Sequence, residues 1–437
     1  MMWEESRGSS SPWSGYLQDM PTSFDTLMFW TQQELEELQG STIRDKIGKE
    51  EAEKDYHEKV LPILQRRHDI FDPNFLDTFF SLQRFHINGS RILSRSFQVE
   101  DWQDDNASDE SRPEEQEEND EDEENPPQLI AAQPSQQGDV EAAPNGPVGL
   151  DEDEDEDEDE EDEDEERDGV SMVPMADILN ARYGCNNAKL FYEKEHLRMV
   201  AVRDINAGEQ IWNTYGDPPN ADLLRRYGYI DVIPFYAQAQ SHEIYESFPY
   251  ENPSDEVEIR ADLVFDVCAP GTPESEKTEK IEVWLNLGGD DTFVIDRKDG
   301  TCKLMLGMIR YLSMTPQEVE EAIEKDKLPK GKPTGDTLKL ALQVLRTRLV
   351  QYTTTLEEDE IILKATAQHN GRMFSAVFVR LWEKRLLRGA LRKMEEILQL
   401  EEEETVHRSN TLTSGRGKRP REETSQEHKA SKKRTRR

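Results

Sequence analysis

Cysteine and long apolar runs are both scarce in this sequence. Only Cys185, Cys268 and Cys302 occur among its 437 residues, and their spacing fits neither a disulfide framework nor a zinc site. No apolar run approaches the roughly 20 residues that cross a bilayer, and the N-terminus does not begin like a secretory signal peptide. We therefore expect reduced thiols in an intracellular compartment, no bound metal and no membrane association.

Positive charge is nearly absent from one long segment. Residues 101–167 hold 32 Asp and Glu against two Arg, a net charge of −30 out of −41 for the whole chain. The segment ends in a run of 16 carboxylates, Asp151 to Glu166. Like charges at this density repel each other and bury no apolar area, which predicts a disordered acidic insertion. The C-terminal end of the chain is positively charged instead. Residues 408–437 carry 11 Lys and Arg against three Glu, which predicts a disordered basic tail.

Local patterns predict a helical start followed by short strands. Thr31-Gln-Gln-Glu34 is a capping box and predicts a helix from Thr31. Residues 83–97 are apolar with interspersed Arg and Ser and are typical of a packed helix. Alternating apolar and polar residues over 190–205 predict two strands joined by a turn, and residues 210–215 predict another short strand. Short strands with tight turns favour an irregular β domain.

The last part of the sequence is typical of a second, α-helical domain. Residues 373–400 form a long candidate helix, whose apolar positions are Phe374, Phe378, Leu381, Trp382 and Leu386. A single helical stripe is formed by Leu338, Leu342, Leu345, Leu349 and Tyr352. A length of 437 residues, at about 100–200 residues per domain, agrees with two domains.

Three phrases combine residue types that can carry chemistry. They are Met175-Ala-Asp-Ile-Leu-Asn180, Gly208-Glu-Gln-Ile-Trp-Asn-Thr-Tyr-Gly216 and Asn220-Ala-Asp-Leu-Leu-Arg-Arg-Tyr-Gly-Tyr229. Each alone has an ordinary interpretation, because Asn and Gly punctuate loops and Tyr beside Gly is usually a half-buried packing residue. Their order and spacing are more specific than any one of them.

In this order the phrases resemble the C-terminal half of a SET domain. There an Asn-His pair ends a strand, a G-E-x-[I/L] turn follows, and a catalytic Tyr lies a few residues beyond. The last phrase resembles the Rubisco-methyltransferase group of SET-domain protein-lysine methyltransferases, and SPWSGYLQDMP followed by FWTQQELEELQGS resembles the helical insert of that group. Within the group, the chain is most similar to the fungal methyltransferases of ribosomal proteins and their nuclear animal relatives.

The resemblance implies an α+β fold with two domains. An irregular β SET domain would comprise residues 1–100, which contain the helical insert, and residues 168–232. The acidic insertion 101–167 would interrupt it. An α-helical substrate-binding domain would follow over 233–400, and the basic tail would occupy 401–437.

The resemblance also implies an S-adenosyl-L-methionine-dependent protein-lysine N-methyltransferase. Its substrate would be a large-subunit ribosomal protein or another nuclear protein, and its location the nucleus or also the cytoplasm. The basic tail would then bind a nuclear import receptor. The alternative is a non-catalytic truncated SET protein that binds or chaperones basic clients through the acidic insertion.

One departure from the family keeps that alternative open. SET domains begin with a strand that carries a Gly-x-Gly phrase, whose backbone holds the cofactor, and nothing before Trp13 supplies one. We therefore expect that this strand is missing and that residues 1–437 bind S-adenosyl-L-methionine weakly or not at all.

Position by position, the resemblance assigns the cofactor site and the catalytic residue. Tyr215 would be the catalytic tyrosine and would also contact the cofactor. Asn180 and Ala181 would hold the cofactor, together with Arg95. Ala181 stands where many SET domains have His, which removes a side-chain hydrogen bond but keeps the backbone contacts. Arg91 is instead predicted to be a surface or packing arginine.

The substrate lysine would meet five side chains. Arg95 and Tyr215 are shared with the cofactor site. Asp177 matches a substrate-side carboxylate, Tyr192 a substrate-facing aromatic residue, and Tyr227 a second tyrosine of the lysine channel.

Overall fold

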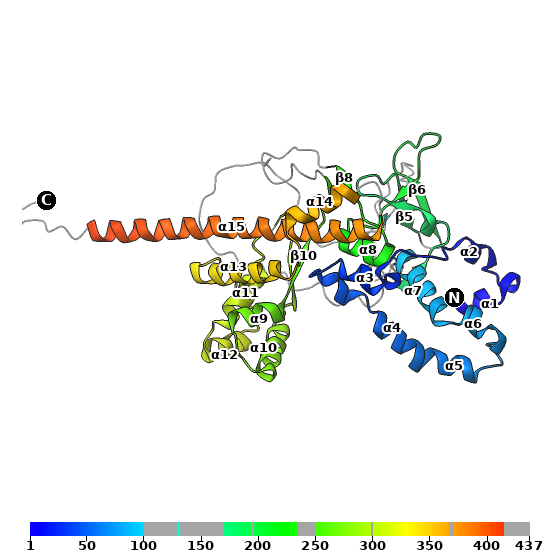
Figure 1. Cartoon of the computed structure of the whole chain (residues 1–437), viewed down its shortest axis with the longest axis horizontal. Helices are drawn as coiled ribbons and strands as arrows, with labels where there is room; N and C mark the ends of the chain where they lie inside the picture. Colours follow the sequence, from blue (N-terminus) through cyan, green and yellow to red (C-terminus); the bar gives the residue numbers. More distant parts are fainter. Residues whose placement is uncertain are drawn as a thin grey trace, which may run out of the picture. The chain divides into compact units, whose positions relative to one another are not determined.

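A computed structural model gives the fold of the chain (Figure 1). The structure describes residues 1–99, 130–131, 169–193, 196–234, 250–298, 300–366 and 371–414. Apart from residues 130–131, the predicted acidic insertion lies outside the described residues, and so does the tail beyond Ser414. The predictions of disorder there stay predictions, whereas the prediction is wrong for residues 401–414 of the tail, which are helical.

The described chain forms two compact units. Unit 1 comprises Met1–Ile259, Val294–Gly300 and Thr347–Arg388, and unit 2 comprises Arg260–Phe293, Thr301–Arg346 and Gly389–Arg437. Helices and short strands occur together, so the predicted α+β class is confirmed. No helix in the described ranges is both long enough and apolar enough to cross a membrane.

Unit 1 begins with a run of short helices. The predicted capping box is present: Thr31 Oγ1 accepts the Glu34 N–H at 3.3 Å, and Glu34 Oε2 accepts the Thr31 N–H at 2.7 Å. The predicted helix over 83–97 is also present, but it ends at Arg95. The helices are α1 (Met2–Ser6), α2 (Ser14–Asp19), α3 (Gln32–Glu36), α4 (Lys49–Asp55), α5 (Leu61–Arg66), α6 (Leu76–Phe79) and α7 (Leu82–Arg95).

The strands of unit 1 bring distant segments together. The predicted hairpin is confirmed as the antiparallel pair of β5 and β6, while the strand expected at 210–215 is only the two-residue β7. β1 pairs antiparallel with β3, and β4 pairs in parallel with β7. The strands are β1 (Ser96–Val99), β2 (Ile130–Ala131), β3 (Gly169–Met172), β4 (Asn180–Ala181), β5 (Ala188–Tyr192), β6 (Leu197–Ala201), β7 (Trp212–Asn213), β8 (Ile233–Pro234) and β9 (Tyr250–Glu251).

Helix α8 (Asn220–Tyr227) carries the last of the three phrases and packs against α7. Gly228 ends it in the left-handed conformation at φ +79°, and a Cβ there would lie 2.8 Å from the backbone of Asp25. Only glycine fits this close approach without displacing the backbone. Leu224 anchors the helix in a core that includes Leu27 and Trp30.

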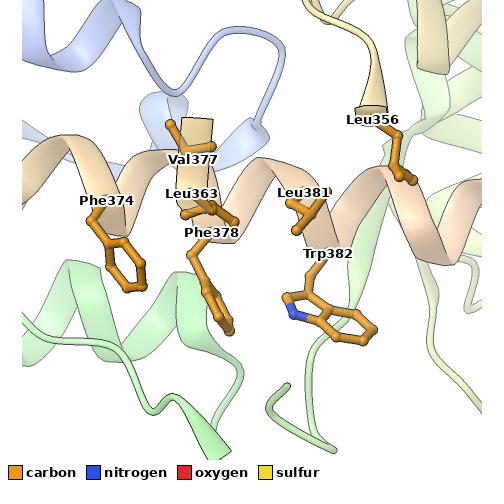
Figure 2. Close-up of a cluster of buried hydrophobic side chains, with 7 residues drawn as sticks. All are labelled: Leu356, Leu363, Phe374, Val377, Phe378, Leu381 and Trp382. Atoms are coloured by element: carbon orange, nitrogen blue, oxygen red, sulfur yellow. The ribbon is translucent and has the colours of Figure 1, made fainter. Parts of the chain in front are cut away.

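A second core of unit 1 lies between α14 (Leu356–Thr366) and the first turns of α15 (Arg372–Ser414). Figure 2 shows its seven buried side chains, which are Leu356, Leu363, Phe374, Val377, Phe378, Leu381 and Trp382. Ile230 and Val232 pack against this cluster from the segment that follows α8. The predicted apolar face of the long helix is therefore confirmed.

Unit 2 is mainly helical. Trp284, Met305 and Leu306 are fully buried in it. The predicted stripe beginning at Leu338 lies on a helix, α13, although Tyr352 lies beyond its end. The remaining elements that lie wholly or partly in this unit are β10 (Val257–Arg260), α9 (Ala261–Cys268), α10 (Glu274–Asn286), β11 (Thr292–Ile295), α11 (Lys303–Leu312), α12 (Pro316–Glu324) and α13 (Gly335–Val350).

Candidate active site

Two tyrosines from separate phrases stack on each other in unit 1. Tyr215 follows β7 and Tyr227 ends α8, and their ring centroids lie 4.4 Å apart with an interplanar angle of 14°. The Tyr215 hydroxyl donates to the Leu179 carbonyl oxygen at 3.0 Å. Burial raises the pKa of Tyr215 to about 12 and raises the pKa of Tyr227 as well. Both phenols are therefore protonated at neutral pH and cannot act there as bases.

Both tyrosines line two of the cavities among the described residues, and the larger of these two lies beside the pair. It measures about 770 Å³, within the range of ligand pockets, and its lining includes Arg95, Asp177 and Tyr192 besides the two tyrosines. All five side chains predicted to meet the substrate lysine thus line one cavity. Tyr192 is nearly buried and donates from its hydroxyl to the Gln98 carbonyl oxygen at 2.7 Å.

A second cavity, of about 520 Å³, is lined by Asn180 and Ala181. Arg95, Tyr215 and Tyr227 line this cavity too, so they belong to both. The parallel pairing of β4 with β7 explains the arrangement, because it fixes Asn180 and Ala181 beside the strand that leads into Tyr215. Asn180 and Ala181, predicted for the cofactor, therefore line a different cavity from Asp177 and Tyr192, predicted for the substrate. The two cavities share Arg95, Tyr215 and Tyr227.

Asp177 is buried with one side-chain oxygen unused. It lies in the turn η7 (Ala176–Ile178), is 4% exposed, and accepts a hydrogen bond on Oδ2 from the Tyr16 hydroxyl. Its Oδ1 has no hydrogen-bond partner among the described residues. The Arg95 guanidinium donates to the main-chain oxygen of Asp177, while Arg95 Nε, also buried, has no partner within the same ranges.

Arg91 packs inside the unit and is not a surface residue. It is 1% exposed, and its Nη1 donates to Glu5 Oε1 at 2.6 Å. Its Nε donates to the Pro21 carbonyl oxygen at 2.9 Å. Arg91 was predicted to be either a surface or a packing arginine, and the packing role is confirmed.

Sequence reasoning missed three residues beside the site. The Tyr229 hydroxyl donates to the Ala181 carbonyl oxygen at 3.4 Å, and burial raises the pKa of Tyr229. Asn213 lines the larger cavity, and its buried Nδ2 has no partner in the described part of the chain. Both belong to the quoted phrases and could have been found there. Tyr16 could not, because its contact with Asp177 spans 161 positions.

A buried hydrogen-bond network fixes the start of α8. Asn220 donates from its backbone N–H to Asp255 Oδ1 at 2.8 Å and accepts the Asp231 N–H on Oδ1 at 2.7 Å. Asp231 in turn accepts the Tyr183 N–H at 2.9 Å. Burial raises the pKa of Asp255 to about 7. The asparagine that opens the last phrase is thus a structural residue that holds the helix carrying Tyr227.

Solved structures show a related architecture. The SET domain of LSMT bound to lysine and AdoHcy superposes with a TM-score of 0.54 at 18% identity, covering 90% of this chain and 73% of that chain. Rubisco LSMT bound to AdoMet gives a TM-score of 0.52 at 18% identity, covering 91% and 73%. The chain has the Rubisco-methyltransferase fold. The predicted SET domain with a helical second domain is therefore confirmed as a fold.

Sequence comparisons agree with the Rubisco-methyltransferase fold. Residues 274–387 match the Rubisco LSMT substrate-binding family. The chain is 32% identical to ribosomal lysine N-methyltransferase 4 of Saccharomyces cerevisiae, over 51% of this chain and 36% of that protein. It is 27% identical to N-lysine methyltransferase SETD6 of Mus musculus, over 89% of this chain and 72% of that protein. The chain thus spans about a third of the yeast relative, and the predicted resemblance is confirmed.

Proposed function

We propose that the chain is an S-adenosyl-L-methionine-dependent protein-lysine N-methyltransferase. The observation that carries this proposal is the stacked pair of Tyr215 and Tyr227, which lines two cavities at once. Methyl transfer is an in-line displacement, so donor and acceptor must approach the same point from opposite sides. Because the two cavities share this pair of side chains, a donor in one and an acceptor in the other would meet beside the tyrosines.

The smaller cavity fits the cofactor by the chemistry of its lining. S-adenosyl-L-methionine supplies an activated methyl group on a sulfonium. Arg95 offers a guanidinium, one nitrogen of which has no partner in the described chain, for the amino-acid carboxylate. Asn180 offers an amide, and the ring of Tyr229 offers an apolar face. The backbone of Ala181 is held by pairing with Asn213, so its contacts do not depend on the histidine found elsewhere.

The larger cavity would receive the lysine side chain. Transfer out of water disfavours the ammonium form of the lysine, which releases the neutral amine that attacks. The hydrogen of the Tyr215 hydroxyl is already donated to Leu179, so the phenol oxygen is left to accept an N–H from that amine. This contact would turn the nitrogen lone pair toward the cofactor. Tyr192 and Tyr227 would confine the aliphatic stem of the lysine, and Asp177 would offer its unused oxygen.

The protein substrate is proposed to be a large-subunit ribosomal protein, bound by the helical domain at residues 233–400. The match of residues 274–387 to the Rubisco LSMT substrate-binding family supports the domain. The name of the yeast relative, ribosomal lysine N-methyltransferase 4, supports the substrate.

A nuclear location is proposed from the basic clusters in residues 416–437, which would bind an import receptor. Such clusters also bind RNA without specificity. A fluorescent fusion that lacks residues 416–437 should no longer accumulate in the nucleus. Unchanged nuclear accumulation would refute the import role.

The enzyme proposal is tested in two steps on the chain of residues 1–437. The sequence alone predicts weak or no cofactor binding, because the Gly-x-Gly strand is missing. The cavity lined by Asn180 and Arg95 leads us to propose instead that calorimetric titration with S-adenosyl-L-methionine gives saturable binding. Incubation with purified large-subunit ribosomal proteins and tritiated cofactor should then transfer label to a lysine, which mass spectrometry would locate. Binding of basic proteins with neither cofactor binding nor transfer would refute the enzyme and favour the non-catalytic binding protein.

A further inference from the structure

We propose that Tyr16 is a positioning residue for the substrate lysine, and that it acts through Asp177. Its hydroxyl would hold the Asp177 side chain so that the second carboxylate oxygen faces the cavity and binds the incoming lysine nitrogen. This role rests on the proposed methyltransferase function. It adds a residue of the helical N-terminal segment to a site otherwise built from the three sequence phrases together with Arg95, Ala181 and Tyr192.

The two residues come from distant parts of unit 1. Tyr16 lies on the short helix α2 and is half-buried, and its hydroxyl donates to Asp177 Oδ2. Among the described residues, Asp177 lines the larger cavity and Tyr16 does not. Tyr16 therefore contacts the carboxylate without itself lining the cavity. Burial raises the pKa of Tyr16 far above neutral pH, so the phenol keeps the hydrogen that it donates.

Two contacts fix Asp177 in complementary ways. Arg95 donates to its main-chain oxygen and so holds the backbone, whereas Tyr16 holds the side chain. A carboxylate has two oxygens, and with Oδ2 engaged only Oδ1 is left for another donor. Without the phenol, rotation of the carboxylate would no longer be restricted.

The unused oxygen has the properties of a ligand contact. Asp177 lines the larger cavity, and its Oδ1 is buried and has no partner in the described ranges. Leaving a buried acceptor unpaired is unfavourable, so a ligand that brings a donor gains binding energy there. A lysine amine or ammonium brings two or three N–H groups. The same cavity wall carries Tyr192, Tyr215 and Tyr227, whose rings suit the aliphatic stem.

The test measures binding, independently of turnover. Nα-acetyl-L-lysine amide is titrated by calorimetry into the full chain in the presence of S-adenosylhomocysteine. Tyr16→Phe should weaken binding about tenfold, because a hydrogen bond to a charged group contributes an amount of that order. The matched control is Tyr56→Phe, which also removes a tyrosine hydroxyl, one that donates to the Phe80 carbonyl oxygen at 2.7 Å. This control should bind the probe as the wild type does.

A double-mutant cycle separates positioning from general damage to the fold. If Tyr16 acts through Asp177, Tyr16→Phe should have almost no further effect on binding in an Asp177→Asn background. Additive losses, or unchanged binding by Tyr16→Phe alone, would overturn the role of Tyr16 and leave the proposed function intact. Absence of probe binding by the wild type would count against the proposed function, and this role would fall with it.

Discussion

Tyr215→Phe isolates the hydroxyl that the proposed mechanism requires. The substitution keeps the ring and therefore the stacking on Tyr227 at 4.4 Å. It removes one hydrogen bond, to the Leu179 carbonyl oxygen, which contributes about 1 kcal/mol to the free energy of unfolding. It also removes the acceptor that orients the amine. Misplacing a reacting group by about 1 Å can lower the rate about 100-fold, and we expect a fall in kcat of that order.

The assay compares Tyr215→Phe with Tyr311→Phe. Tyr311 is a buried tyrosine of unit 2 that also donates to a carbonyl oxygen at 3.0 Å, that of Lys280, so both substitutions remove the same kind of bond. Both variants should lose about 1 kcal/mol of stability in denaturant unfolding. Only Tyr215→Phe should lose single-turnover methyl transfer. The cofactor affinity of each variant, measured by calorimetry, shows whether the loss lies in binding or in the chemical step.

Two results would refute this reasoning. If Tyr215→Phe transfers methyl groups at a rate close to that of the wild type, the hydroxyl does not orient the amine. If Tyr311→Phe loses activity to the same extent, the loss comes from stability and not from the reaction centre. A large fall in kcat with a loss of stability no greater than that of Tyr311→Phe would support the assignment most directly.

Three further predictions concern the framework of unit 1. Gly228→Ala should destabilise the fold by about 1–3 kcal/mol in denaturant unfolding, because it adds a clash with Asp25 to a left-handed backbone. Gly184→Ala, at φ +64° in open space, should show the smaller backbone strain alone. Replacing residues 101–167 by a short Gly-Ser linker should leave the melting temperature nearly unchanged, because β1 and β3 bring the two chain ends together. A large drop would show that the segment is structural. Asp255, with a pKa raised to about 7, holds in the folded state a proton that the unfolded chain releases above about pH 4. Its contribution to stability should therefore fall by about 1.4 kcal/mol per pH unit from about pH 4 to 7, and Asp255→Asn should remove that slope.

Local signals in the sequence predicted local elements well. The capping box at Thr31, the β5–β6 hairpin and the apolar face of α15 all follow from short-range patterns, and all are present. The sequence predicts helix through residue 97, whereas the strand β1 already begins at Ser96. The local pattern cannot indicate this strand, because its partner β3 lies beyond the acidic insertion. Periodicity also cannot predict that Ile230 packs against the buried cluster of α14 and α15, because it shows that a face is apolar but not what covers it.

The family resemblance supplied the candidate site residues, but it could not supply their geometry. Spacing alone does not reveal that Tyr215 and Tyr227 stack, or that Asp177 keeps one oxygen unpaired in the described chain. Both facts depend on contacts between segments far apart in the sequence. The same holds for the phenol of Tyr16, whose phrase resembles the helical insert but does not indicate a contact with Asp177.

Ala181 occupies a position where many SET domains have histidine, and the backbone at this position is fixed without that side chain. A histidine there would contribute a side-chain hydrogen bond, and Ala181 has none to offer. Its backbone is nevertheless fixed twice, by parallel pairing with Asn213 and by the Tyr229 hydroxyl, which donates to its carbonyl oxygen at 3.4 Å. Tyr229 directly follows Gly228, and the close approach of Gly228 to Asp25 fixes the end of α8. The contacts that a cofactor would make at this position therefore depend on the backbone and on α8, which is why we locate the sensitive point of the site at Gly228 and not at Ala181.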